Sequence, residues 1–164
     1  MTTCEESPCA TIRVTAHDRV NREQLATCAA MLRNLAEWFG DSKAVSAYLN
    51  DLPSLETYLA QRGSGIVGFA AVKRNGPRVA EIHVMGVARD ERRRGVGRAL
   101  MNRMVEDLAR SGINSLIVQT LSPSDPYPAY AETRAFYEAM GFAPLREFQK
   151  TDWTDPTLVM VRNL

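Results

Sequence analysis

The sequence contains few of the residues that metal centres, disulfide frameworks and membrane spans require. It has three cysteines, Cys4, Cys9 and Cys28, an odd number with no CxxC pair among them, and two histidines. This pattern predicts reduced thiols and no metal site. No run of about 18 apolar residues occurs, and the segment before Ile12 has no apolar stretch of signal-peptide length. We therefore expect a cytoplasmic protein without a membrane partner.

A strong charge of one sign is also missing. Twenty basic and nineteen acidic residues give a formal net charge of +1, so no global field favours nucleic acid or membrane. Six arginines nevertheless lie between Arg89 and Arg103. A small nucleic-acid-binding domain would use such a cluster, but it would interleave aromatic residues with the basic ones, and none occur there. We expect no nucleic-acid partner and infer that the cluster has a local purpose.

The chain is organised as one unit. Its 164 residues fit a single domain over 1–164, in which 1–10 is expected to be a flexible leader. No internal repeat and no linker-like change of composition divides it. Asn21 and Gln24 form a helix-capping pattern, and apolar residues follow at helical spacing until Gly40. The pattern predicts a strand at 11–15, one helix from this cap to Gly40 and a shorter helix at 44–52.

From Pro53 onward the pattern changes to strands with two interposed helices. The turn at 62–65 predicts a hairpin, and glycines at 112 and 141 predict helix ends. The predicted elements are strands at 56–61, 66–73 and 78–87, a helix at 95–111, a strand at 115–121, a loop at 122–130, a helix to Met140, and strands near 145–153 and 158–161. This order predicts an α/β (α+β) fold with a mixed sheet flanked by helices.

The stretch "RRRGVGR" (92–98) is the most informative motif. Gly95 and Gly97 follow a predicted strand and precede a predicted helix, which places flexible backbone N–H groups at a helix N-terminus. Such an end attracts anions, and arginine forks suit phosphate oxygens. The motif predicts a phosphate-containing ligand. The alternative is that Arg92, Arg93 and Arg94, with Arg98 one turn further along, form only a solvated surface.

Two common nucleotide motifs do not fit this stretch. A Walker loop requires GxxxxGK followed by Ser or Thr, which the sequence lacks. A dinucleotide fingerprint requires a glycine three residues after Gly97, and Leu100 occupies that position. Both nucleotide-binding interpretations are therefore weakened.

Two motifs together resemble the GNAT acetyltransferases. The order Arg92, Gly95, Gly97 after "AEIHVMGV" is similar to the pyrophosphate loop of that superfamily, and "TRAFYEAMGF" (133–142) is similar to its tyrosine-bearing helix, which ends in Gly-Phe. The resemblance covers 66–142 well. It implies a mostly antiparallel central sheet in which a splayed strand pair forms an acetyl-CoA cleft. It also implies acetyl transfer to an amine, with acetyl-CoA as co-substrate and no metal.

The resemblance also implies which residues bind the cofactor. Backbone groups of Arg93 to Arg98 would hold the pyrophosphate, and the strand at Met85 and Val87 would pair with the pantetheine arm. Gly86 between them marks either the splayed strand or a packing position under a helix. At position 130 many relatives carry an asparagine that bonds the pantetheine, whereas this chain has tyrosine. The implied cofactor-binding residues are Met85, Val87, Arg92, Arg93, Arg94, Gly95, Val96, Gly97, Arg98, Tyr130 and Tyr137.

Acetyl transfer to an amine requires a base, because a lysine-like amine has a pKa of about 10.4. Glu81 is the candidate, since a similar glutamate acts as base in the histone-modifying branch of the family. Strand alternation predicts that Glu81, His83 and Met85 share one sheet face, which makes His83 a second candidate. Either side chain could instead be a structural polar group.

Two further groups would complete the chemistry. A backbone N–H near Val87 could polarise the thioester carbonyl. Tyr137 would protonate the departing thiolate, as the matching tyrosine does in many relatives; the alternative is that it only packs. Direct attack in a ternary complex is the mechanism that the resemblance implies.

The acceptor surface predicted from the resemblance combines Trp38, Phe39, Tyr48 and the loop at 122–130, with Asp125 and Glu132 as ammonium partners. Aromatic and acidic groups suit a small cationic amine. A peptide or protein amine, and a catalytically idle acyl-CoA-binding regulatory module, stay open as alternatives. Monomer and homodimer are both open as well.

Overall fold

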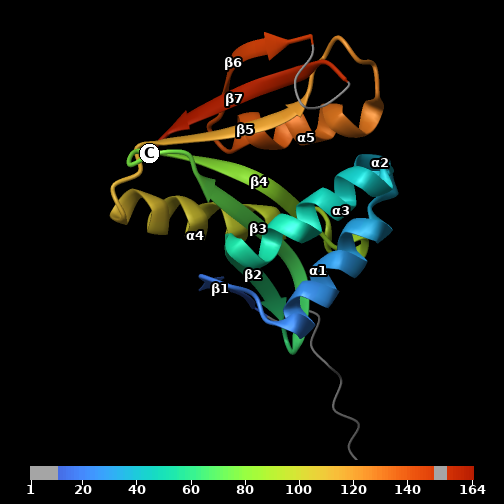
Figure 1. Ribbon diagram of the computed structural model, residues 1–164, viewed down its shortest axis with the longest axis vertical. Helices are drawn as coiled ribbons and strands as arrows, with labels where there is room; N and C mark the ends of the chain where they lie inside the picture. Colours follow the sequence, from blue (N-terminus) through green and yellow to red (C-terminus); the bar gives the residue numbers. More distant parts are fainter. Residues whose placement is uncertain (1–10, 150–154) are drawn as a thin grey trace, which may run out of the picture.

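The computed structural model describes residues 11–149 and 155–164, and within them it has one mixed sheet of seven strands (Figure 1). The strand order is β1-β2-β3-β4-β5-β7-β6, and every neighbouring pair is antiparallel except β4 and β5. The predicted mixed, mostly antiparallel sheet is confirmed. The strands are β1 (Ile12–His17), β2 (Glu56–Arg62), β3 (Gly65–Arg74), β4 (Val79–Val87), β5 (Ser115–Leu121), β6 (Ala143–Phe148) and β7 (Thr157–Asn163).

Helices cover both faces of the sheet through two separate apolar clusters. One cluster joins the helices of the N-terminal third to β2, β3 and β4, and includes Cys28, Leu32 and Phe69. The other joins α4 and α5 to the opposite face, and includes Leu100, Met104 and Tyr137. In the described ranges no helix has the length and apolar character for a membrane crossing. The helices are α1 (Arg22–Asn34), α2 (Ala36–Phe39), α3 (Ser42–Asp51), α4 (Val96–Arg110) and α5 (Pro128–Ala139), with short 3₁₀ turns at Leu52–Ser54 and Arg89–Glu91.

Local sequence signals placed most elements correctly, and two helix boundaries differ. Asn21 and Gln24 form the predicted capping box on α1, but the predicted single helix breaks at Leu35, where φ is −103° and ψ is 48°. Leu35 is buried, and the four residues of α2 turn toward α5, so tertiary packing overrides the helical spacing. The loop predicted to reach 130 ends earlier, because Pro128 occupies the first turn of α5, a position that suits proline. Of the strand predicted at 145–153, residues 150–154 lie outside the described residues.

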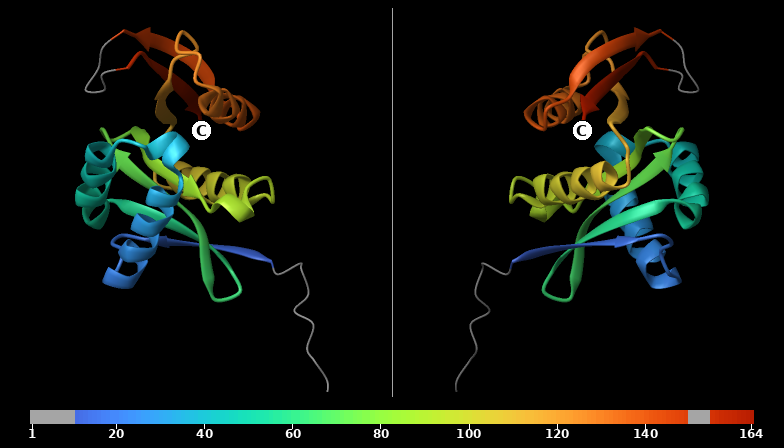
Figure 2. Two further views of the ribbon diagram at one scale, coloured as in Figure 1. Left: turned by 90° about the vertical axis from the view of Figure 1, so that its right-hand side faces the viewer. Right: turned by 90° about the vertical axis from the view of Figure 1, so that its left-hand side faces the viewer.

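The sheet splits between β4 and β5. These parallel strands pair only from Val79–Ile82 on one side to Ser115–Val118 on the other. Beyond that point, β1 to β4 with α1 to α4 form one part of the molecule, and β5 to β7 with α5 form the other (Figures 1 and 2). The predicted splayed strand pair is confirmed.

A β-bulge reverses the direction of side chains along β4. The register with β3 moves from Ala71↔Val84 to Val72↔Ile82, which leaves His83 as an extra residue. Ile82 accordingly packs on the α4 side of the sheet, whereas Val84 packs on the α1 side. Met85 then returns to the α4 side. The prediction that Glu81, His83 and Met85 share one face is therefore wrong for Met85, because alternation is shifted by one residue at a bulge.

Candidate active site

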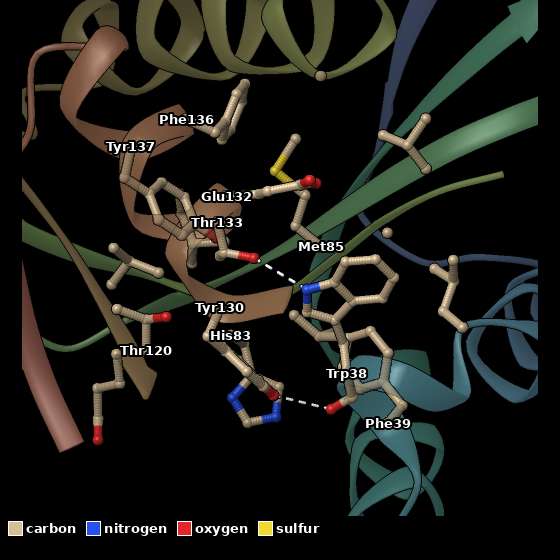
Figure 3. A pocket seen from close by; sticks show the side chains of 18 of the residues that line it. Trp38, Phe39, His83, Met85, Thr120, Tyr130, Glu132, Thr133, Phe136 and Tyr137 are labelled. Atoms are coloured by element: carbon tan, nitrogen blue, oxygen red, sulfur yellow. Dashed lines mark hydrogen bonds between the residues drawn. The ribbon is translucent and has the colours of Figure 1, made fainter. Parts of the chain in front are cut away.

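A cavity of about 860 Å³ lies where β4 and β5 diverge. Its walls come from α2, α3, the end of β3, β4, the loop that begins α4, β5 and α5. Side chains of α5, including Phe136 and Tyr137, face those of α2, including Trp38, across it (Figure 3). Elements far apart in the sequence therefore meet around one space.

One end of the cavity is a cradle of backbone N–H groups. Gly95 (φ 83°) and Arg93 (φ 60°) both adopt left-handed backbone conformations, and Gly95 caps α4 without any side-chain hydrogen bond. The first helical hydrogen bond of α4 runs from Ala99 N–H to Gly95 O at 2.9 Å. The N–H groups of 96–98 precede it and have no partner within the helix. Together with the helix dipole they form an anion-binding site.

Gly97 is closely packed at this cradle. A Cβ at this position would lie 3.1 Å from Cε2 of Phe136 and 3.6 Å from Cε of Met85. The first distance is tighter than ordinary carbon contacts, so any side chain would push α5 away or fill the cradle. The glycine thus keeps the loop and α5 close together.

The arginines of the motif have different surroundings. Arg93 and Arg98 line the cavity, and within residues 11–149 and 155–164 neither has a hydrogen-bond or ion-pair partner. Arg94 does not line the cavity; its side chain is 63% exposed and lies 3.7 Å from Glu91. The side chain of Val96 is buried in the core, so only its backbone can serve a ligand. The solvated-surface alternative therefore fits Arg94, and Arg93 and Arg98 are available to an anion.

Arg92 joins the loop to two helices. Its guanidinium lies 4.3 Å from the centroid of the Trp38 ring and pairs with the Glu132 carboxylate at 2.9 Å. A cation over a tryptophan face is attracted by the ring quadrupole. The side chain is thus committed to α2 and α5 in this structure.

Trp38 is the centre of what we call the latch: Trp38 on α2, Arg92, and Tyr130, Glu132 and Thr133 on α5. The indole Nε1–H donates to Thr133 Oγ1 at 3.0 Å and to Ala129 O at 3.2 Å. The Tyr130 hydroxyl donates to Trp38 O at 2.8 Å (Figure 3). Burial raises the pKa of Tyr130 to about 12, so the phenol remains a donor at neutral pH. Tyr130, which departs from the family pattern, and Thr133 thus both contribute to this contact.

The two candidate bases lie on the α3 side of β4. The carboxylate of Glu81 accepts hydrogen bonds from Asn75 Nδ2 at 2.8 Å and from Gln119 Nε2 at 3.0 Å. These neutral donors hold it at the point where β4 and β5 separate. His83 Nε2 lies 3.0 Å from Asp51 Oδ2 on α3. A neutral ring that donates from Nε2 keeps Nδ1 as an acceptor.

Tyr137 has the protonation state that an acid needs. It lines the cavity from α5 and is 7% exposed, and no hydrogen bond of its hydroxyl occurs among the described residues. Burial, with a smaller effect from Tyr48 and Tyr130, raises its pKa above the usual phenol range. Its ring packs against Phe136 and Phe142, with centroids 5.5 Å and 5.4 Å away. The hydroxyl is thus protonated and has no hydrogen-bond partner among the described residues, and the packed ring fixes its position.

The two predicted ammonium partners are placed differently in the structure. Asp125 does not line the cavity; its Oδ1 accepts from Tyr127 N–H at 3.0 Å within the loop. Glu132 lines the cavity but is neutralised by Arg92. The sequence pattern could not reveal either pairing, because both depend on how the loop and α5 fold. The prediction is therefore wrong for Asp125, and for Glu132 it stays a prediction.

Sequence reasoning missed three residues that shape the site. Thr120 is 2% exposed, lines the cavity, and is the buried side chain whose oxygen has no partner among the described residues. Its signal was a polar residue in the apolar strand "SLIVQTL". Asp51 holds His83 and gave no signal. A Cβ on Gly68 would lie 2.7 Å from Val96, so this glycine lets α4 begin close to β3.

For Gly86, the sequence left open a splayed strand or a packing position under a helix. A Cβ at this glycine would lie 3.4 Å from Leu35, which favours the packing position.

Comparisons of the sequence and of the fold with known proteins point to the same family. Residues 25–142 match the model of the acetyltransferase (GNAT) family. No curated protein matches the sequence. The fold is similar to that of a GNAT acetyltransferase from Elizabethkingia anophelis with acetyl-CoA bound (TM-score 0.68, 16% identity, 93% of this chain and 98% of that chain). It is also similar to the ribosomal-protein-S18-alanine N-acetyltransferase of Escherichia coli (0.70, 17%, 92% and 94%) and to aminoglycoside 6′-acetyltransferase type Ii (0.68, 23%, 92% and 96%).

Proposed function

The chain belongs to the GNAT family of acetyltransferases, and on that basis we propose that it is an N-acetyltransferase that moves an acetyl group from acetyl-CoA to the primary amine of a small molecule. The observation that carries the proposal is the cavity itself. It joins an anion cradle at the start of α4 to a protonated, uncommitted tyrosine and a pair of candidate bases. A site for an anionic acyl carrier thus continues into a site suited to proton transfer.

The residues at the cradle fit the coenzyme. The N–H groups of 96–98 and the guanidinium groups of Arg93 and Arg98 suit a pyrophosphate, which needs many donors. From Val84 onward, β4 pairs with β3 but no longer with β5. Its free edge at Met85 and Val87 can therefore bind an extended amide chain as an added strand does. When bound, acetyl-CoA supplies a thioester carbonyl as the acyl donor.

Three groups of this chain would divide the chemistry. Glu81 takes a proton from the ammonium so that the neutral amine nitrogen can form the new C–N bond. A backbone N–H near Val87 donates to the carbonyl oxygen as negative charge develops on it. Tyr137 gives its proton to the sulfur as the C–S bond breaks, and water passes to the phenolate the second proton that the nitrogen loses as the amide forms, while Glu81 releases its proton to solvent. The products are an amide and a thiol.

Direct attack fits better than an acetyl-enzyme intermediate. Cys28 is the cysteine within the described residues; it is fully buried, and that burial raises its pKa to about 12. Because the thiolate is the nucleophilic form, this side chain cannot accept an acetyl group at neutral pH. We infer that amine and acetyl donor occupy the cavity together.

The test is thiol release from acetyl-CoA in the presence of a panel of small primary amines, peptides and a ribosomal-protein terminus, with mass spectrometry of the product. The proposal expects amine-dependent thiol release and an acetylated small amine. Acetylation of peptides but of no small amine would show that the acceptor is a protein amine. Binding of acetyl-CoA without thiol release from any amine would identify a regulatory module and overturn the proposal.

A further inference from the structure

We propose that the acceptor is a monoamine whose nitrogen is joined by a short linker to an aromatic ring, and not a polycation such as a polyamine or an aminoglycoside. This inference rests on the proposed acetyltransferase function and adds the chemical class of the acceptor. It depends on two properties of the cavity end away from the cradle: its aromatic surface and its charge.

Aromatic rings form a continuous surface there. Phe39 on α2 meets Tyr48 on α3 edge to face with centroids 5.9 Å apart, and Tyr48 meets His83 on β4 in the same way at 5.4 Å. All three line the cavity, and Trp38 adds a further ring from α2 (Figure 3). Each is only partly buried, so it retains surface for a ligand. Aromatic groups prefer such edge and offset contacts and bury a large area in them.

The tyrosine of this surface is uncharged at neutral pH. Burial, with smaller effects from Tyr130 and Glu81, raises the pKa of Tyr48 to about 12, so its phenol keeps its proton. The face of Trp38 already has the Arg92 guanidinium 4.3 Å from its centroid. A ligand cation stacked on that indole would meet this charge. The rings therefore suit an apolar ring of the ligand better than an additional ammonium group.

The charges of the lining disfavour a polycation. Outside the cradle, two basic side chains, Lys73 and Arg92, and two acidic ones, Glu81 and Glu132, line the cavity. Arg92 already neutralises Glu132, which leaves Glu81 as the carboxylate of the lining that is not paired with a cation among the described residues. Lys73 lies directly opposite Glu81 in the β3–β4 register. One ammonium group can be accommodated, and each further one would be desolvated without a partner.

The positions along β4 favour a short linker. His83 ends the aromatic surface, and Glu81, the proposed base, lies two residues before it. Two residues of a regular strand span roughly 6 to 7 Å, and the bulge at His83 makes this an upper limit for the separation along β4. A ring on the aromatic surface and a nitrogen near Glu81 can thus be joined by a short linker. We therefore choose 2-phenylethylamine as the probe.

The experiment compares kcat/KM for 2-phenylethylamine with the values for butylamine, putrescine and kanamycin in the same thiol-release assay. The inference expects at least a tenfold preference for 2-phenylethylamine over butylamine, since a buried ring contributes one order of magnitude or more. It expects putrescine and kanamycin to be poorer still. Thiol release that is fastest with putrescine or kanamycin, or equal for all amines, overturns the acceptor class and leaves the proposed function standing. If no amine causes thiol release, both the acceptor class and the proposed function are overturned.

A matched pair of variants ties the preference to the surface. Phe39→Leu removes a ring from the aromatic surface and keeps an apolar side chain, so the ratio of kcat/KM for 2-phenylethylamine to that for butylamine should fall severalfold. Phe148→Leu makes the same change on β6, away from the cavity, and should leave the ratio unchanged. Thermal melting confirms that both variants are folded. An unchanged ratio in Phe39→Leu, or an equal fall in both variants, contradicts the inference.

Discussion

The two ends of the cavity are built in different ways. The cradle comes from one continuous stretch of chain, 92–98, and acts mainly through backbone N–H groups that two left-handed residues and a helix N-terminus arrange. The acceptor end comes from side chains of α2, α3, β4, β5 and α5, held together by the latch and by hydrogen bonds between distant residues. A site made of backbone groups can therefore be predicted from a short stretch of sequence, whereas a site made of side chains from several elements depends on the whole fold.

The largest effect is expected from a change in the cradle, which should remove binding of the coenzyme. Gly97→Val should abolish acetyl-CoA binding, because the added side chain collides with Phe136 and fills the cradle. Acetyl-CoA should raise the melting temperature of the parent protein and leave that of this variant unmoved.

The control for this change is Gly65→Val, where a new Cβ would have only an ordinary contact of 3.8 Å to Arg62 O. Its melting temperature should rise with acetyl-CoA as in the parent. An equal rise in the Gly97 variant would show that the cradle is not the coenzyme site.

A change at Glu81 should affect turnover and spare the cradle. Glu81→Gln keeps the shape of the side chain and one of the two oxygens that accept from Asn75 and Gln119, but removes the base, so kcat should fall by about 10² to 10⁴ with acetyl-CoA affinity near normal. The loss should shrink as the pH approaches about 10, where the amine loses its proton unaided. Steady-state kinetics over a pH series measures both. A slight loss that is independent of pH would favour His83 or deprotonation in solution.

Tyr137→Phe should have a smaller effect on the same step. A coenzyme thiol with a pKa near the roughly 8.5 of cysteine is a tolerable leaving group, so the expected fall in kcat is about 10², the lower end of the acid–base range. The ring keeps its packing, and binding of acetyl-CoA should be retained. Tyr127→Phe, on an exposed tyrosine outside the cavity lining, is the matched control. Unchanged kcat in a folded Tyr137→Phe protein would mean that this tyrosine only packs.

The smallest effect is expected at the latch. Tyr130→Phe removes the hydrogen bond to Trp38 O, which should lower the free energy of unfolding by about 1 kcal/mol. It should raise the KM of the amine severalfold, because α2 carries part of the aromatic surface, while the Kd of acetyl-CoA stays the same. Denaturant unfolding and calorimetric titration check the two parts. A clear loss of acetyl-CoA affinity would instead support the predicted role of Tyr130 in cofactor binding.

The same contrast explains what the sequence predicted. The capping box at Asn21, the hairpin turn at 62–65 and the glycine that begins α4 are local signals, and the structure contains each of them. The break at Leu35 and the bulge at His83 are set by packing against other elements, so helical spacing and strand alternation both failed there. The pairing of Glu132 with Arg92 joins residues forty positions apart and has no local pattern.

The most direct test of two substrates sharing one cavity is the initial-rate pattern with acetyl-CoA and an accepted amine both varied. If amine and acetyl donor are bound together, double-reciprocal plots at several fixed amine concentrations should intersect to the left of the vertical axis. Parallel lines, together with an acetylated protein detectable by mass spectrometry before amine is added, would show that the acetyl group passes through the enzyme. That result would contradict direct transfer across the cavity.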